Sequence, residues 1–178
     1  MMAEIRALKP EEILLLEEFL YLAIFIPQGL ALLPRSILKE PELEMYIKDF
    51  GQQPDDWALA AEVDGLLVGA VWVRILKDYG YFDDQTPSLS ISFLPDFRGQ
   101  GLGQQLMTAM LDLLKAKGYP SVSLSVSKDN PAVRFYQRLG FVMVEEREDD
   151  YLMVCRLKSE KKTHETRTIN LYSTSPFE

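Results

Sequence analysis

Residues 89–103, with the sequence LSISFLPDFRGQGLG, decide the fold of this chain. Alternating strand residues lead into a turn that holds three glycines, Gly99, Gly101 and Gly103. A helix with regularly spaced leucines is predicted to follow at once, over residues 100–117. The first turn of a helix has backbone N–H groups without intrahelical partners, and the macrodipole adds positive potential there. Because glycine lacks a Cβ, an anion can approach these groups closely, so the segment indicates a phosphate-binding site.

Two common phosphate-binding motifs do not match this segment. A P-loop requires Gly-Lys followed by Ser or Thr, and the turn contains no lysine. The dinucleotide motif Gly-x-Gly-x-x-Gly fails because Leu106 stands where the third glycine would be. The remaining pattern is Arg-x-x-Gly-x-Gly, from Arg98 to Gly103, and it resembles the pyrophosphate loop of the GNAT superfamily of acyl-CoA N-acyltransferases. A glycine-rich connection without a ligand is the alternative interpretation.

A second segment, DNPAVRFYQRLGF at residues 129–141, follows a predicted strand. Asp129 or Asn130 can cap a helix that begins at Pro131, and Gly140 suits its end, so a helix of about two turns is predicted. The segment also resembles another GNAT motif, Asn-x-x-Ala-x-x-x-Tyr-x-x-x-Gly-Phe, apart from one residue of spacing. The matching residues are Asn130, Ala132, Tyr136, Gly140 and Phe141. The resemblance covers roughly residues 57–157 and is strongest over residues 89–141.

The composition indicates the class of protein and excludes several kinds of partner. The chain has 178 residues, of which 19 are basic and 27 acidic, for a net charge of −8. This charge argues against nucleic acid or an anionic membrane as the main partner. A cationic acceptor would fit the charge, although solubility explains it equally well. Cys155 is the only cysteine and His164 the only histidine, so neither a disulfide, a metal site nor a Ser-His-Asp triad is expected.

No membrane span or signal peptide is expected near the N-terminus. Residues 13–26 are strongly apolar, but Glu17 and Glu18 interrupt them, and the remaining run is shorter than the ~20 residues that a spanning helix needs. The segment has no basic leader and no small-residue cleavage site. A helix buried on one face is therefore predicted, and the lone Cys155, expected to pack in the last strand, agrees with a cytoplasmic location.

The predicted elements follow the order β-α-α-β-β-β-α-β-α-β-β. Strands are expected at residues 4–8, 57–63, 66–75, 88–94, 121–127, 141–147 and 151–157, and the first two helices at 10–23 and 41–50. Asp64-Gly65 is a strong hairpin turn signal. The GNAT resemblance implies an α/β (α+β) fold, in which one mixed, mostly antiparallel sheet carries helices on both faces. We expect a single domain over residues 1–158 and a polar tail over residues 159–178, rich in Lys, Glu, Thr and Ser.

The resemblance also implies where acetyl-CoA would bind. In this family the cofactor lies in a V-shaped opening between the fourth and fifth strands, here residues 88–94 and 121–127. The main chain of Phe93 would meet the acetyl carbonyl and the pantetheine arm. The backbone N–H groups of the glycine turn would hold the pyrophosphate, and Asn130 would bond to the pantetheine. The Arg98 side chain would supplement the turn, while the Phe93 side chain would pack in the core. The candidate cofactor-binding residues are thus Phe93, Leu94, Arg98, Gly99, Gln100, Gly101, Leu102, Gly103 and Asn130.

The implied reaction is attack of a neutral amine on the thioester carbonyl. It requires removal of the amine proton, stabilisation of the developing oxyanion and a proton for the departing thiolate. Tyr136 matches the family position for the general acid that protonates the sulfur. The alternative is that Tyr136 is a helix-face aromatic packed under the sheet.

The general base is not evident. Many relatives carry a Glu in the fourth strand, but residues 88–92 of this chain offer only alternate serines, and residues 121–127 repeat the pattern. These two serine rows either let a helix pack closely or hold a water chain that carries the ammonium proton away. Asp83, Asp84 and Glu62 are further candidate bases.

The acceptor is expected to be a small-molecule amine or a peptide. In the family, the first two helices and their connection often wall the acceptor side, which here means residues 24–33 and also residues 79–82. Such apolar and aromatic walls suit an amine with a hydrophobic portion, although core or dimer packing explains them as well, and a homodimer is a candidate assembly. We therefore expect an N-acetyltransferase that uses acetyl-CoA. The alternative is a CoA-binding sensor or partner-binding module without catalysis.

Overall fold

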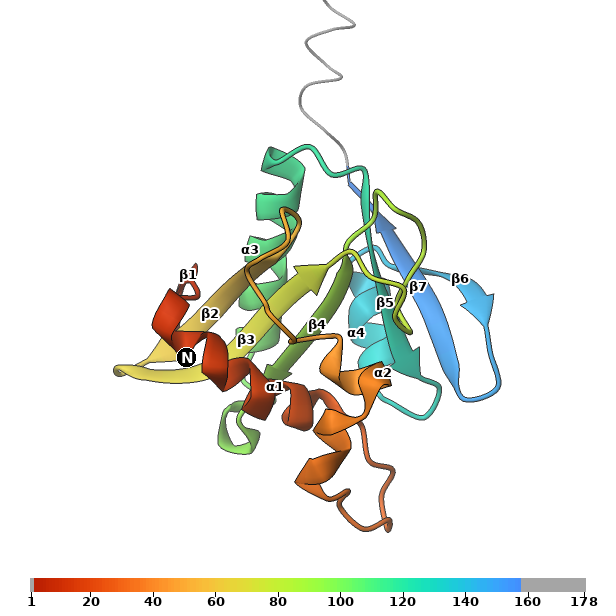
Figure 1. Cartoon of the computed structure of the whole chain (residues 1–178), viewed down its shortest axis with the longest axis horizontal. Helices are drawn as coiled ribbons and strands as arrows, with labels where there is room; N and C mark the ends of the chain where they lie inside the picture. The colour runs from red at the N-terminus through yellow and green to blue at the C-terminus, as the bar shows by residue number, and fades with distance from the viewer. Residues whose placement is uncertain (1, 158–178) are drawn as a thin grey trace, which may run out of the picture.

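Seven strands form one mixed sheet in the order β1-β2-β3-β4-β5-β7-β6 (Figure 1). The structure is a computed structural model and describes residues 2–157. The strands are β1 (Glu4–Ala7), β2 (Trp57–Val63), β3 (Leu66–Arg74), β4 (Ser88–Phe93), β5 (Ser121–Ser127), β6 (Val142–Glu146) and β7 (Asp150–Arg156). The helices are α1 (Leu16–Ala23), α2 (Pro41–Glu44), α3 (Leu102–Ala116) and α4 (Ala132–Arg138), with 3-10 helices η1 (Pro10–Leu15), η2 (Arg35–Lys39) and η3 (Pro95–Phe97). The expected tail, with His164, lies outside the described residues.

The predicted strands and the hairpin are confirmed. Most observed strand ends lie within one residue of the predicted ones. Asp64 and Gly65 have φ angles of 50° and 79°, as a two-residue turn of the hairpin type requires. Only β4 and β5 run parallel, whereas every other neighbouring pair of strands is antiparallel. The predicted fold class is therefore confirmed.

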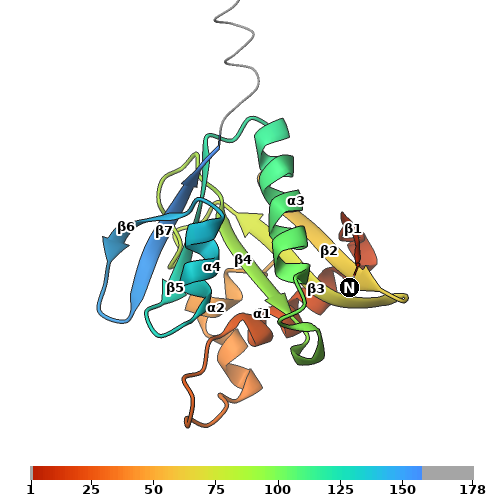
Figure 2. The same ribbon diagram turned by 180° about the vertical axis from the view of Figure 1, so that it is seen from behind.

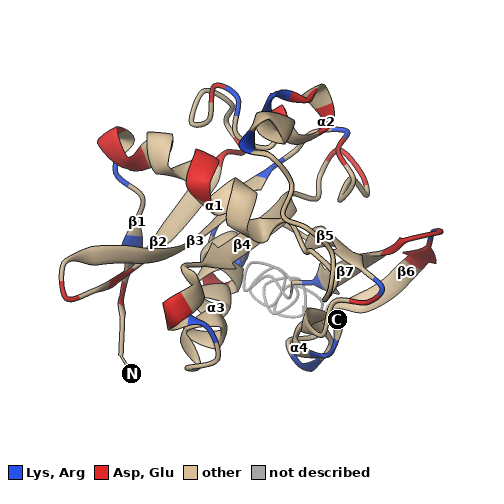
Figure 3. Ribbon diagram, turned by 90° about the horizontal axis from the view of Figure 1, so that it is seen from below, with Lys and Arg blue, Asp and Glu red and all other residues tan. Residues whose placement is uncertain are grey.

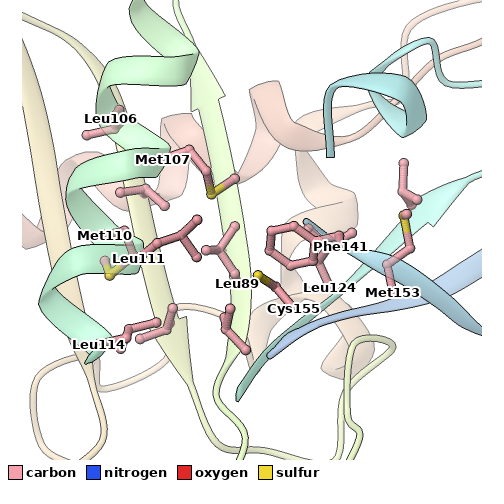
Figure 4. Packing of buried hydrophobic residues seen from close by; sticks show 14 of the residues in the cluster. Leu89, Leu106, Met107, Met110, Leu111, Leu114, Leu124, Phe141, Met153 and Cys155 are labelled. Atoms are coloured by element: carbon pink, nitrogen blue, oxygen red, sulfur yellow. The ribbon is translucent and has the colours of Figure 1, made fainter. Parts of the chain in front are cut away.

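Helices cover both faces of the sheet, as Figures 2 and 3 show, with α3 and α4 on one face and α1 and α2 on the other. On the α3 face, Leu106, Met110 and Leu114 are fully buried and pack toward Phe141 and Cys155 (Figure 4). Cys155 thus packs in the last strand as predicted. On the α1 face, the buried core gathers Leu16, Phe19, Leu20, Leu38, Phe50, Ala70 and Trp72. Among residues 2–157, no helix combines the length and hydropathy needed to cross a membrane.

The prediction of a second helix over residues 41–50 was wrong in its extent, because side chains of β3 bind carbonyl groups of this segment. Helix α2 ends at Glu44, and the chain continues in turns. Arg74 donates to the carbonyls of Met45 and Lys48, and Trp72 Nε1 donates to the carbonyl of Tyr46. A continued helix would need these carbonyls for its own N–H groups.

Two other helix predictions need correction at their first turns. Residues 10–15 form the 3-10 helix η1 rather than the start of one α-helix, and α1 begins at Leu16. Helix α3 begins at Leu102 rather than at residue 100, because Gly99 and Gly101 have φ angles of 72° and 80°. These left-handed residues cannot continue a right-handed helix.

The sheet opens between its two parallel strands, and this opening positions the candidate site. Strand β4 pairs with β5 only at Ser88 and Ser123, where the Ser123 N–H donates to the Pro87 carbonyl (2.9 Å). Beyond that point the two strands diverge (Figure 1). The expected V-shaped opening is therefore present.

Candidate active site

Two cavities meet at the opening between β4 and β5. The larger has a volume of about 640 Å³ and runs from the opening to the glycine turn, and the smaller, of about 250 Å³, extends toward α1 and the loop before β4. Residues from α1, β4 and α4 or their flanks line both cavities, namely Ala23, Phe25, Ile91, Asn130 and Tyr136. Ligands in the two cavities would thus meet beside Tyr136.

The glycine turn forms one end of the larger cavity. Gly99, Gly101 and Gly103 line it, together with Arg98. Left-handed residues that alternate with other conformations create a concave row of backbone N–H groups that binds anions. The turn also leads directly into α3, whose N-terminus adds positive potential. This end of the cavity suits a phosphate or pyrophosphate.

Three of the predicted cofactor residues do not line the larger cavity. Leu102 is 1% exposed and its side chain belongs to the core. The Gln100 amide donates to the Asp96 carbonyl (3.0 Å) and so holds the turn itself. The Leu94 N–H donates to the Val68 carbonyl within the sheet (2.8 Å). Their contribution to ligand binding would therefore come from main-chain groups or from shaping the turn.

The charge of the larger cavity is opposite to that of the whole chain. Arg98 and Arg138 line it, and none of its described lining residues is acidic. Sequence reasoning missed Arg138, although it lies two residues after Tyr136 on the short helix α4, whose basic residues Figure 3 shows in blue. Two guanidinium groups in a chain of net charge −8 favour an anionic ligand at this place.

The Arg98 side chain is folded back onto the protein. Its Nε donates to the Phe93 carbonyl (3.2 Å), and its Nη2 lies 3.5 Å from the Leu22 carbonyl. Arg98 therefore joins the end of β4 to the C-terminal end of α1, at the rim of the larger cavity. This contact gives Arg98 a structural part beyond the supplementary charge that the sequence suggested.

The edge of β4 that faces the opening presents main-chain groups. Leu94 donates to Val68 of β3, and every second residue of an antiparallel ladder bonds to the same neighbour. Ser92 therefore bonds toward β3, and the main-chain groups of Ile91 and Phe93 point toward the opening. The Phe93 ring is 8% exposed and packs in the core, as predicted.

Asn130 and Tyr136 lie where the two cavities meet. The Asn130 side-chain oxygen accepts the Ala132 N–H (2.9 Å) and so caps α4, which leaves its amide nitrogen as a donor for a ligand. The Tyr136 ring packs against Phe135 and Phe141, with centroid distances of 5.5 and 5.8 Å. Burial raises the pKa of Tyr136 to about 12, so the phenol stays protonated at neutral pH.

The smaller cavity has apolar walls from α1 and the segment after it. Leu20, Ile24 and Phe25 line it on that side, and Tyr46 and Tyr79 close the other. Only the first part of the predicted wall at residues 24–33 takes part, because Leu30 and Leu32 are exposed and line neither cavity. The walls suit a small molecule with a hydrophobic portion.

Most of the serine hydroxyls in β4 and β5 bind neighbouring segments. Ser92 donates to the Phe19 carbonyl in α1 (2.6 Å), and Ser125 donates to Asp150 (2.7 Å). Ser123 donates to the Gly80 carbonyl, and Ser121 shares a hydrogen bond with Thr86. For these four serines, the hydrogen bonds support the packing explanation of the serine rows.

The three carboxylates considered as bases lie away from both cavities. Asp83 accepts the Gln85 N–H (2.8 Å), and Asp84 accepts the Tyr81 hydroxyl (2.6 Å). Glu62 pairs with Arg6 (3.1 Å) where β1 and β2 meet. None of the three lines either cavity. Within residues 2–157, no group of three or more His, Cys, Asp or Glu side chains is placed to hold a metal ion.

The fold matches those of several solved acyltransferase structures. The PaiA N-acetyltransferase of Thermoplasma acidophilum, solved in complex with coenzyme A, superposes with a TM-score of 0.64 at 20% identity, over 88% of this chain and 99% of that one. The YncA protein of Salmonella typhimurium, solved with acetyl-CoA, gives a TM-score of 0.65 at 19% identity, over 90% of this chain and 96% of that one. At these identities the likeness shows the fold alone.

Sequence comparisons show the family. An acetyltransferase from Pectobacterium atrosepticum is 33% identical over 107 residues, which cover 60% of this chain and 70% of that protein. The mycothiol acetyltransferase of Clavibacter sepedonicus is 37% identical over 89 residues. The match covers 49% of this chain but only 27% of that protein's length. The family model described as "Acetyltransferase (GNAT) family" matches residues 26–141, which include the opening, the glycine turn and α4. The chain therefore belongs to the GNAT acetyltransferase family.

Proposed function

We propose that this protein is an N-acetyltransferase. It transfers the acetyl group of acetyl-CoA to a primary amine of a small molecule or peptide, by direct attack in a ternary complex. The observation that carries the proposal is the meeting of two cavities beside Tyr136, where β4 and β5 separate. One cavity suits a long phosphorylated ligand and the other a small partner.

In this proposal acetyl-CoA occupies the larger cavity. Its pyrophosphate lies against the backbone N–H groups of the glycine turn, with Arg138 nearby. Its pantetheine follows the free edge of β4, where main-chain groups of Ile91 and Phe93 pair with its amides, and Asn130 donates from the opposite side. The thioester then lies beside Tyr136. Two solved GNAT structures with the same fold contain coenzyme A or acetyl-CoA, which supports this choice of ligand.

The acceptor occupies the smaller cavity. Its amine nitrogen attacks the thioester carbonyl, a C–N bond forms and the C–S bond breaks. Tyr136 gives its proton to the departing sulfur, for which it is suited because its phenol is protonated and lines both cavities. The volume of about 250 Å³ favours a small amine or the end of a peptide.

Calorimetry combined with an amine screen tests the proposal. The protein is titrated with acetyl-CoA, then incubated with acetyl-CoA and a panel of aliphatic, aromatic and peptide amines. We expect saturable cofactor binding and an acceptor-dependent release of thiol, with a product that is heavier by one acetyl group. Mass analysis identifies the modified nitrogen. Tight binding of acetyl-CoA without acceptor-dependent release would instead identify the protein as a CoA-binding sensor.

A further inference from the structure

Asp78, a half-buried residue in the loop between β3 and β4, has one fully buried carboxyl oxygen. Its Oδ1 atom and the Ser88 Oγ atom are both buried and lack a hydrogen-bond partner among the described residues. The two side chains are neighbours, because the Ser88 hydroxyl partly offsets the rise that burial gives to the pKa of the Asp78 carboxyl. Ser88 lines the smaller cavity. Ser88 is thus a residue of the smaller cavity that lies next to the Asp78 carboxyl.

The loop is built to bring this carboxyl close to β4. A Cβ atom at Gly80 would clash with Ser88 Oγ, so the glycine allows the loop to approach the strand. The Gly80 N–H partly offsets the rise that burial gives to the pKa values of the Tyr46 phenol and the Asp78 carboxyl. Arg147, from the turn between β6 and β7, donates to the Tyr79 carbonyl (2.7 Å) and holds the loop from outside. These contacts fix Asp78 in place.

We propose that Asp78 is the general base of the reaction and takes the proton of the acceptor ammonium group, with Ser88 between them. This inference rests on the proposed acetyl transfer. It answers the question that the sequence left open, since β4 carries serines where many relatives carry a glutamate. Ser88 lines the smaller cavity, and its Oγ and the Asp78 Oδ1 are the buried side-chain polar atoms without a hydrogen-bond partner among the described residues.

The proton balance of the step is complete. The ammonium gives one proton to the Asp78 carboxylate through Ser88, whose hydroxyl passes its own proton on and takes the ammonium proton. The neutral nitrogen then attacks the thioester carbonyl and loses its second proton. That proton replaces the one that Tyr136 gives to the sulfur. The products are the amide, the free thiol of coenzyme A and one proton on Asp78.

A third hollow gives this proton a way out. It has a volume of about 400 Å³, lies on the outer side of the loop and is lined by Asp78, Tyr79, Glu42, Lys77 and Arg147, with Pro41 and Met45. Asp78 therefore borders this hollow and contacts the smaller cavity through Ser88. Burial raises the pKa of Asp78 to about 6, with Arg147 opposing the shift, so the carboxylate is ionised at neutral pH and still accepts a proton readily.

Asp78→Asn is the direct test, and Asp83→Asn is its matched control because Asp83 lies in the same loop and lines neither cavity. With the best amine of the screen, we expect Asp78→Asn to lower kcat at neutral pH by about 10²-fold or more, and Asp83→Asn to leave it unchanged. Ser88→Ala should lower kcat less, and Asp78→Glu should restore part of the loss. Binding of acetyl-CoA, measured by calorimetry, should be the same in all variants.

A neutral nucleophile separates a base from a merely structural residue. The same assays are repeated with an O-substituted hydroxylamine analogue of the acceptor, whose nitrogen is uncharged at neutral pH. A loss of at most a few fold for Asp78→Asn with this analogue, against the large loss with the amine, supports the proposal. An equal loss with both acceptors overturns it, as does full activity of Asp78→Asn with the amine at neutral pH.

The two proposals fail in different ways. If the wild type binds acetyl-CoA but acetylates no amine of the panel, the proposed function is overturned and the role of Asp78 with it. If the wild type is active and Asp78→Asn has the same pH–rate profile, only the inference about Asp78 is overturned. If Asp78→Asn unfolds, the pH–rate profile of Ser88→Ala decides. The proposal requires that the change in rate near pH 6 occur at a different pH in Ser88→Ala than in the wild type.

Discussion

Tyr136 lines both cavities, and the surroundings of its hydroxyl group set the chemistry of that group. Burial holds the pKa of Tyr136 at about 12, well above neutral pH. The ring itself packs against two other aromatic rings, so removal of the hydroxyl should leave the fold intact. The phenol and the packing role can therefore be separated by one substitution.

We predict that Tyr136→Phe lowers kcat by about 10²-fold, because the departing thiolate loses its proton donor. The affinity for acetyl-CoA should change little, since the ring and the glycine turn remain. Steady-state kinetics and calorimetry measure the two quantities. Tyr81→Phe is a suitable control because the Tyr81 hydroxyl binds Asp84 and lines neither cavity. Unchanged turnover in Tyr136→Phe would remove this residue from the mechanism.

Gly69 is a second residue with a specific requirement, because its backbone lies under the Phe93 ring. A Cβ atom at Gly69 would clash with that ring. We predict that Gly69→Ala destabilises the protein by about 1–3 kcal/mol, the usual range for overpacking a core. It should also weaken acetyl-CoA binding by displacing the end of β4. The double variant Gly69→Ala/Phe93→Leu should recover stability in urea denaturation, and a double variant less stable than either single one would contradict this explanation.

At the scale of elements, the segment after α2 shows how side chains of the sheet position a wall of the smaller cavity. Arg74 on β3 pairs with Asp56 (2.9 Å) and also binds the carbonyls of Met45 and Lys48. The Asp56 side chain is fully buried and accepts the N–H groups of Gly51 and Gln53. This network replaces the helix that the sequence suggests, and it holds Tyr46 at the cavity.

We predict that Asp56→Ala destabilises the protein by about 3–5 kcal/mol, because it leaves the buried Arg74 guanidinium without its carboxylate. Glu18→Ala is the control. It breaks the solvent-exposed pair between Glu18 and Arg35, and it should barely move the denaturation midpoint. Urea denaturation followed by circular dichroism measures both variants. Similar midpoints for the two would show that the Arg74 network contributes little.

Elements with strong local signals were predictable from the sequence. The strands show alternating residues, Asp64-Gly65 specifies the hairpin, and the leucine spacing of α3 gives its buried face. The glycine turn and the motif around Tyr136 carry their own pattern, and six of the nine candidate cofactor residues line the larger cavity. Such features depend on residues that are close in the chain.

Features made by distant segments were not predictable. The early end of α2 depends on Arg74 and Trp72, whose side chains take carbonyls far away in the sequence. Arg138 reaches the larger cavity only because α4 packs beside the opening. Asp78 lies in a loop without periodicity, and its burial results from Tyr46, Gly80 and the turn that carries Arg147. No local pattern marks such a residue as a base.

For the whole molecule, the role proposed for Asp78 would link activity to stability. Burial raises the pKa of its carboxyl from an ordinary 3.8 to about 6. The folded protein therefore binds this proton more tightly than the unfolded chain does. It follows that the contribution of Asp78 to the free energy of unfolding falls as the pH rises from about 4 to about 6. At neutral pH the ionised carboxylate makes the folded state less stable.

We predict that Asp78→Asn is more stable than the wild type at neutral pH, by roughly 1–3 kcal/mol, because the amide resembles the protonated carboxyl. Near pH 4, where the folded protein already holds the proton, the difference should vanish. Urea denaturation without acetyl-CoA, at several pH values across this interval, measures the difference. Asp83→Asn controls for the loss of one negative charge from the same loop. If Asp78→Asn gains no stability over the wild type as the pH rises, the Asp78 carboxylate is well solvated. That result would contradict the idea of a base held in a buried site.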